Sequence, residues 1–166
     1  MNQRYIEISI DEILPADDTI LSSLYETKFE SPDSSVVEFI HDAKNQFKNI
    51  AKPMGIIRPI SKTEFSNIYV GIGLNASVSP LETIFHKSDF LHLFAATIGS
   101  NISEKITDYF DQGDYLKGYL LNSIASIATD QISEYFENIV TTKNNKTLSY
   151  SPGYCGWHVS GQHTLF

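Results

Sequence analysis

The chain has 166 residues, of which 42% are hydrophobic and 12% aromatic, and its 20 acidic residues outnumber its 12 Lys and Arg, giving a formal net charge of −8. A chain of this length and composition can bury a core, which excludes a disordered tail and predicts a single domain over residues 1–166. Nucleic-acid backbones and anionic membrane surfaces attract clustered basic residues, so the acidic balance argues against both partners.

Cysteine usage and hydropathy predict a cytoplasmic protein. Cys155 is the only cysteine, so an intrachain disulfide is excluded and a reducing compartment fits. The first fifteen residues carry charges every few positions and lack the apolar block of a signal peptide. No apolar run approaches the roughly 20 residues that cross a bilayer, so we expect no membrane partner.

Four segments have the alternating or β-branched apolar pattern of strands. They are residues 5–10, 55–60, 68–70 and 90–98. The second contains Pro59, which lacks the N–H group that a central strand donates, so we expect a short or edge strand there. The last segment is almost entirely apolar and predicts a buried strand, with His92 as a hydrogen-bonded core histidine.

Other segments have the apolar spacing of helices. They are residues 18–27, residues 36–50, a segment that opens at Pro80, residues 102–110 and a longest segment after Asp114 with Leu116, Leu120, Ile124, Ile127, Gln131, Ile132 and Tyr135 on one stripe. Ser79, Pro80 and Glu82 form a helix-start signature in which Ser79 caps the helix. Strands and helices alternate only irregularly, which predicts an α+β fold.

Residues 71–76 match the G-x-G-x-x-A pattern of dinucleotide-binding turns. Such a site needs a helix that opens directly after the glycines, so that its N-terminus faces the pyrophosphate. The next helix signal comes several residues later, at Ser79-Pro80. This spacing favours a plain tight turn over a dinucleotide site.

The C-terminal segment gathers three residues that are common metal ligands. Cys155, His158 and His163 lie close together in the sequence, and thiolate sulfur and imidazole nitrogen bind zinc and similar ions. The sequence offers no second clear pair of ligands that would complete a tetrahedral site, and it does not identify the metal. The alternatives are a redox or nucleophilic Cys155, which needs a positive neighbour, and a structural tail whose Tyr154 and Trp157 pack on the core.

Residues 149–154 read Ser-Tyr-Ser-Pro-Gly-Tyr and predict a sharp bend. Proline fixes φ and glycine accepts positive φ, so the backbone can reverse its direction within a few residues. Such a bend can present main-chain groups and the Tyr154 ring to a ligand, or it can be a rigid turn without one.

Several motifs resemble the activation domain of cobalamin-dependent methionine synthase and its stand-alone relatives. Gly153-Tyr154 resembles the end of the R-x-x-x-G-Y element of that domain. Similar segments are Phe-Ala-Ala-Thr-Ile-Gly at 94–99, Glu-Lys-Ile at 104–106, Gly-Asp-Tyr at 113–115 and Ala-Thr-Asp-Gln-Ile-Ser-Glu at 128–134. The order and spacing of these motifs carry the resemblance, which is firm over about residues 90–157.

The resemblance implies one α+β domain with a mainly antiparallel, bent sheet flanked by helices. It implies binding of S-adenosylmethionine and docking on a corrinoid-binding protein or methyltransferase whose cobalt has been oxidised to inactive Co(II). An electron from a flavodoxin-like donor and a methyl group from S-adenosylmethionine then restore methylcobalt. The ligand-binding positions that it implies are Glu134, Gly153 and Tyr154, and it assigns no catalytic residue to the chain.

Two positions depart from the family pattern. Ser149 and Gln131 stand where the family has arginines, and arginine is the usual bidentate partner of a carboxylate. The expected arginine hydrogen bonds to the carboxylate of the methionine moiety are therefore missing. The chain also lacks the D-x-H-x-x-G motif of corrinoid-binding domains and the length of a methyltransferase barrel, so cobalamin would come only through a partner.

Three functions stay open at this point. The first is an activation-domain-like protein that assists corrinoid reactivation. The second is a non-enzymatic binding or assembly module of the same fold that does not bind S-adenosylmethionine. The third is a small metal or redox protein that uses Cys155, His158 and His163.

Overall fold

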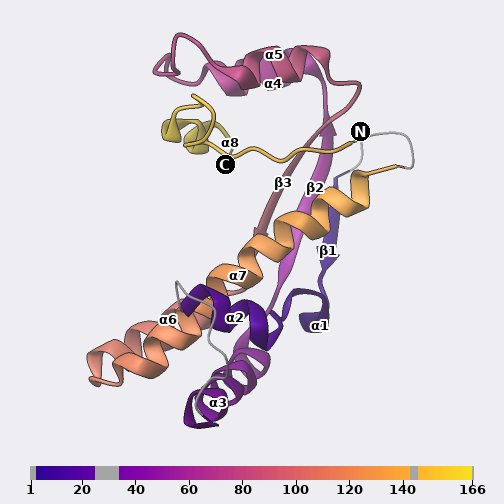
Figure 1. Ribbon diagram of the computed structural model, residues 1–166. Coiled ribbons are helices and arrows are strands. Elements are labelled where there is room, and N and C mark those ends of the chain that lie inside the picture. Colours follow the sequence, from indigo (N-terminus) through magenta and orange to yellow (C-terminus); the bar gives the residue numbers. More distant parts are fainter. Residues whose placement is uncertain (1–2, 25–33, 143–145, 166) are drawn as a thin grey trace. The chain divides into compact units, whose positions relative to one another are not determined.

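The computed structural model describes residues 3–24, 34–142 and 146–165 (Figure 1). Its α+β class is the one that the sequence predicts. Three strands form an antiparallel open sheet in the order β1 (Arg4–Glu7), β2 (Met54–Ile60) and β3 (Leu91–Thr97). The helices are α1 (Ile10–Ile13), α2 (Asp17–Leu24), α3 (Ser34–Ile50), α4 (Lys62–Val70), α5 (Pro80–Lys87), α6 (Ser100–Asp111), α7 (Tyr115–Val140) and α8 (Gln162–Leu165), with the 3-10 helix η1 (Val159–Gly161).

The chain packs into two compact units. The tail unit comprises Met1–Arg4, Ile56–Phe94 and Val140–Phe166, and the helical unit comprises Tyr5–Gly55 and Ala95–Ile139. All three strands contribute residues to both units. The prediction of a single domain over residues 1–166 stays a prediction.

The core of the helical unit comes from the apolar stripes that the sequence predicts. On α3, Ile40, Ala43 and Phe47 are buried at helical spacing, and α3 contacts both α2 and α6. The buried side chains of α7 are Leu120, Leu121, Ile124, Ala125, Ala128, Ile132 and Phe136. Leu116, expected on the same stripe, is 51% exposed because it lies in the first turn of α7, ahead of the buried residues.

The predicted helices are confirmed within the described residues. Helix α2 covers the described part of the segment 18–27, and residues 25–27 lie outside the described residues. Helix α6 ends at Asp111 and is followed by Gly113, whose φ is +80°. Its left-handed backbone turns the chain into α7.

An aromatic cluster forms the core of the tail unit. Phe65 and Tyr69 on α4 pack with Phe85 on α5 and with Trp157 from the C-terminal segment. The Phe65 ring meets the rings of Phe85 and Trp157 edge to face, at centroid distances of 5.0 and 5.5 Å. Edge-to-face contacts of this kind stabilise aromatic pairs beyond the burial of their area, so this cluster ties α4, α5 and the C-terminal segment together.

The strand predicted at residues 68–70 is wrong, because these residues complete α4. The Ser61 hydroxyl accepts a hydrogen bond from the Glu64 N–H (3.1 Å) and caps the helix. Helical geometry then places Phe65 and Tyr69 on one face, four residues apart, where both are buried. The β-branched residues of this segment follow the tertiary contact rather than their own preference for strands.

The strand predictions need three further corrections. β1 ends at Glu7, and Ile10, expected within that strand, opens α1. β2 is the central strand rather than an edge strand. It tolerates Pro59 because this residue stands next to the last residue of the strand, where a missing N–H donor disturbs the hydrogen-bond ladder least. β3 forms as predicted, but its residues are only half-buried or exposed, as befits an edge strand of an open sheet.

Candidate functional site

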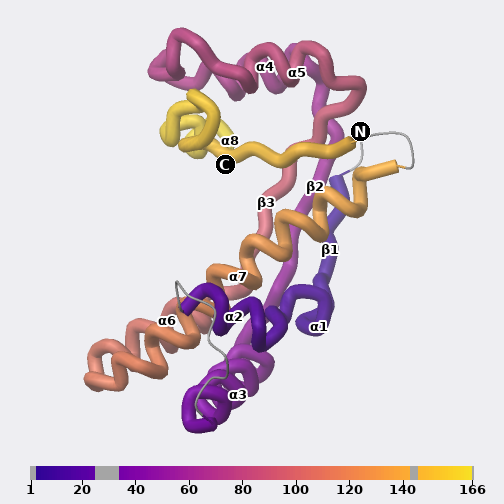
Figure 2. The backbone as a smooth tube through the Cα atoms, in the orientation of Figure 1, coloured from indigo at the N-terminus to yellow at the C-terminus, as the bar shows by residue number. Residues whose placement is uncertain are grey.

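Two glycine-rich segments of the tail unit, residues 71–79 and residues 151–158, dock onto each other, and we call them the loop pair. Figure 2 traces the first as the loop after α4 and the second in yellow. The Ser79 hydroxyl donates to the carbonyl oxygen of Cys155 at 2.6 Å. The sequence predicts that Ser79 caps α5, but this hydroxyl is committed to Cys155, so the prediction of a side-chain cap is wrong.

Further hydrogen bonds complete the loop pair. The Ala76 N–H donates to the Gly156 carbonyl oxygen, and the His158 N–H donates to the Asn75 side-chain oxygen, each at 2.9 Å. Gly156 has φ +81°, and a Cβ there would lie 3.0 Å from the Cβ of Ala76, so this close approach requires glycine. The segment that matches the dinucleotide pattern is therefore a turn that receives the C-terminal segment.

Ser149, Gly153 and Tyr154 occupy exposed positions in the C-terminal segment. The Gly153 N–H donates to the Trp157 carbonyl oxygen (2.7 Å), and the Tyr154 N–H donates to the Ser151 carbonyl oxygen (3.1 Å). Both donors are thus used inside the bend. Tyr154 can offer its ring to a ligand, because the residue is 67% exposed. The prediction that Tyr154 packs on the core is therefore wrong, whereas Trp157, which is 3% exposed, does pack on the core.

Gln131 and Glu134 lie one turn apart on α7, in the helical unit. Glu134 is exposed, whereas Oε1 of Gln131 is buried and has no hydrogen-bond partner within the described part of the chain. A buried polar atom without a partner costs about 1–3 kcal/mol. The exposed Glu134 carboxylate is an acceptor that suits the ammonium or hydroxyl groups of a ligand, whereas the buried Gln131 oxygen is not accessible to one.

A pocket of about 310 Å³ opens on the helical unit where β3 ends and where α6 and α7 meet. Small, hydroxyl-bearing and aliphatic side chains line it: Ala96, Thr97, Ile98, Ile102, Ser103, Ile106, Asn122, Ala125, Ser126 and Thr129. Ala125 and Ser126 are small side chains on α7, and at this point they border a hollow. Its volume is at the lower end of the ~300–1,000 Å³ of small-molecule sites.

A pocket of about 300 Å³ also lies in the tail unit, between the start of α4 and the start of β3. Lys62 and Asp89 bring charges of opposite sign to its wall. The Lys62 ammonium donates to the His86 carbonyl oxygen at 2.7 Å, so α5 holds this ammonium in place.

The metal alternative gains no support. Cys155 is exposed, and the His158 ring caps η1, because its Nδ1 accepts a hydrogen bond from the Ser160 N–H at 3.2 Å. His163 lies exposed on α8. Among the residues that the structure describes, no group of three or more His, Cys, Asp or Glu side chains can hold a metal ion.

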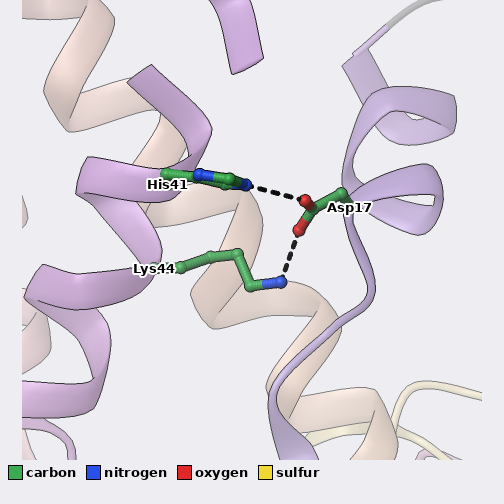
Figure 3. A network of polar contacts seen from close by, with 3 residues as sticks. All are labelled: Asp17, His41 and Lys44. Atoms are coloured by element: carbon green, nitrogen blue, oxygen red, sulfur yellow. Dashed lines mark hydrogen bonds and ion pairs between the residues drawn. The ribbon is translucent and has the colours of Figure 1, made fainter. Parts of the chain in front are cut away.

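Sequence reasoning did not identify a cluster of charged side chains between α2 and α3 (Figure 3). Asp17 Oδ2 lies 3.1 Å from His41 Nε2, and Asp17 Oδ1 accepts a hydrogen bond from the Lys44 ammonium. The hydrogen bond from Lys44, helped by His41 and opposed by partial burial, lowers the pKa of Asp17. The spacing of His41 and Lys44 places both on one helix face, but nothing in the sequence points to Asp17 as their partner.

His92 corrects another prediction. It lies on β3 but is exposed, so it is not a core histidine. Desolvation, followed by the charge of Arg4 on β1, lowers the pKa of His92 below its ordinary value. The strand was expected to be buried on both faces, but the edge of an open sheet leaves this side chain accessible.

No protein-family model matches the chain, and a search of curated proteins finds no significant match. The resemblance to the methionine synthase activation domain therefore depends on the motifs alone. Within the described ranges, no helix combines the length and the apolarity that a membrane crossing requires.

Proposed function

We propose that this chain is a cytoplasmic, stand-alone activation-domain-like protein that docks on a corrinoid-binding protein and assists the reductive reactivation of its cobalt. S-adenosylmethionine is the proposed ligand of the chain, and a flavodoxin-like protein is the proposed electron donor. The observation that carries the proposal is the ordered series of motifs over about residues 90–157, together with the place of several motif residues at one pocket.

The pocket of the helical unit draws motif residues from three elements. Ala96, Thr97 and Ile98 belong to the motif at the end of β3, Ile106 to the motif in α6, and Thr129 to the motif in α7. Residues that are distant in sequence thus meet at one hollow of small-ligand size. A shared ligand-binding role of the motifs predicts such a gathering, which supports the proposal.

One acceptor on α7 fits part of the proposed ligand. The exposed carboxylate of Glu134 suits the ammonium group or the ribose hydroxyls of S-adenosylmethionine. Ser149 and Gln131 replace the two arginines that would hold the carboxylate group, so we expect weaker binding than a bidentate pair provides.

Each party has a separate chemical task in this proposal. The corrinoid of the partner supplies the methyl-transfer chemistry. This chain binds and orients the ligand, and within the helical unit Glu134 accepts hydrogen bonds from it.

Capture of a corrinoid protein tests the docking step. The purified chain is immobilised and incubated with native lysate, and the retained proteins are identified and examined for the visible absorption of cobalamin. We expect an identified corrinoid-binding protein to be retained above the level of an unrelated acidic control protein. Retention no greater than on the control would contradict the proposal.

One specific observation favours a second candidate, a binding module without S-adenosylmethionine. The N–H groups of Gly153 and Tyr154, which the resemblance assigns to a ligand-holding bend, are already bonded within that bend. Under this alternative the chain retains a protein partner but produces no heat with S-adenosylmethionine.

A further inference from the structure

The pocket of the tail unit is independent of the proposed function. It has a volume of about 300 Å³ and lies where β2 passes into α4 and where the connection from α5 enters β3. None of its described lining residues belongs to the motifs that resemble the methionine synthase activation domain. Its volume is at the lower end of the ~300–1,000 Å³ of ligand sites, so it suits a small molecule.

The start of α4 brings a positive charge and hydrogen-bond donors to this pocket. The Lys62 ammonium uses one of its three N–H donors on the His86 carbonyl oxygen at 2.7 Å, which fixes its position and leaves two donors. The Ser61 hydroxyl accepts a hydrogen bond from the Glu64 N–H at 3.1 Å and keeps its own O–H to donate. These donors suit a carboxylate.

The connection from α5 to β3 brings a negative charge to the same pocket. Asp89 is exposed, and the ion pairs of the described part of the chain do not include it, so its carboxylate and the Lys62 ammonium line one hollow without pairing. An unpaired carboxylate suits an ammonium group. His92 adds no further positive charge near neutral pH, because desolvation and, after it, the charge of Arg4 lower its pKa.

Apolar side chains complete the wall of the pocket. They are those of Pro59, Ile60, Phe90 and Leu91. Phe90 is 69% exposed, whereas Phe65 and Phe85 of the same unit are buried in the aromatic cluster. An aromatic ring left exposed beside a hollow provides apolar area that a ligand can cover.

We propose that this pocket binds a free α-amino acid with an apolar side chain. The carboxylate of the ligand binds Lys62 and Ser61, its ammonium group binds Asp89, and its side chain packs on Phe90. A zwitterion matches a wall that carries one charge of each sign. A simple anion or cation would leave one of the two wall charges partly desolvated and without a partner.

Titrations of the full chain with three related compounds, followed by NMR of the backbone amides, test this proposal. The compounds are L-phenylalanine, 3-phenylpropionate, which lacks the ammonium group, and 2-phenylethylamine, which lacks the carboxylate. We expect L-phenylalanine to bind with a Kd of about 1 mM or lower and to shift most strongly the amides of residues 60–62 and 89–92. We expect each truncated compound to bind at least about tenfold more weakly.

Two variants separate the charges. Asp89→Asn should remove most of the preference for L-phenylalanine over 3-phenylpropionate, and Lys62→Gln should remove most of the preference over 2-phenylethylamine. Glu82→Gln and Lys87→Gln make the same changes of charge on α5, outside the lining of the pocket, and should keep both preferences.

Three results would overturn the proposal. The first is the absence of shifts at about 10 mM L-phenylalanine, and the second is similar affinity for all three compounds, which indicates apolar adsorption only. The third is an Asp89→Asn variant that keeps the full preference of the wild type. Because none of these results depends on the motif residues, the proposed function and this proposal can fail separately.

Discussion

At the scale of single residues, Asp17 has the most clearly defined electrostatic surroundings in the described part of the chain. It faces Lys44 and His41 across the α2–α3 contact, and its pKa is lowered, first of all by the hydrogen bond from Lys44. The native state therefore favours the ionised carboxylate more than the unfolded chain does. This stabilisation is present above the ordinary pKa of 3.8 and is lost as the pH falls through the lower native value.

Asp17→Asn is expected to lower the free energy of unfolding by about 0.5–1 kcal/mol at pH 7, the size of a partly exposed ion pair. Urea unfolding measures the loss, and the gap to the wild type should narrow as the pH falls below the ordinary Asp17 pKa of 3.8. Asp18→Asn removes the neighbouring acidic residue in the same first turn of α2 and controls for the helix dipole. A control variant that is as unstable as Asp17→Asn would show that the contacts with α3 contribute nothing.

His92 allows a test within the tail unit. Because desolvation is the larger cause and the charge of Arg4 the smaller one, Arg4→Gln should raise the pKa of His92 only part of the way to its ordinary value. Titration of the imidazole protons by NMR measures this shift. Lys87→Gln removes another cation of the tail unit, one that is not a cause of the His92 shift, and should leave the His92 titration in place; an unchanged pKa in Arg4→Gln would refute the assignment.

At the scale of elements, two serines in similar sequence settings have different structural roles. Ser61 caps α4 through the Glu64 N–H, whereas Ser79, which precedes α5, holds the C-terminal segment through the Cys155 carbonyl. Both hydroxyls precede a helix and have Glu three residues later, so the sequence alone assigns them the same role.

Ser79→Ala should therefore loosen the C-terminal segment rather than α5. We expect faster amide hydrogen exchange over residues 151–158 and a loss of about 1 kcal/mol, the usual net contribution of one hydrogen bond. Ser61→Ala is the matched variant and should cost a similar amount while it leaves exchange in that segment unchanged. Equal exchange of the segment in both variants would contradict the distinct role of Ser79.

Gly55 marks the closest packing of β2 within the helical unit. A Cβ at this position would lie 2.5 Å from the Phe136 ring and 2.9 Å from the Ala95 carbonyl oxygen. Gly55→Ala should cost about 1–3 kcal/mol through overpacking. The double variant with Phe136→Leu should lose less than the sum of the two single variants, because the smaller side chain makes room, and strict additivity in urea unfolding would refute the contact.

At the scale of the whole molecule, patterns local in sequence were predicted well. The periodicity of α3 and α7, the helix start at Pro80 and the tight turn at residues 71–76 all depend on neighbouring residues. The order of the strands could not be predicted. Pro59 was the one sequence signal for strand position, and it indicated an edge where the structure has the central strand; the order depends on contacts between distant segments.

The candidate site shows the same limit. The sequence places Gln131 and Glu134 on one helix, and the structure agrees. The sequence did not indicate that Oε1 of Gln131 would be buried without a hydrogen-bond partner, or that residues 71–79 would contact the C-terminal bend. Both features arise from long-range packing, for which one sequence contains no pairwise signal.

Calorimetric titration of the purified chain with S-adenosylmethionine tests the central claim most directly. We predict saturable heat for one ligand per chain, at least about tenfold weaker binding in Glu134→Ala, and unchanged binding in Asp108→Ala, which removes an exposed carboxylate of α6 outside the motifs. The absence of binding at millimolar ligand, or equal binding by Glu134→Ala and the wild type, would contradict the account.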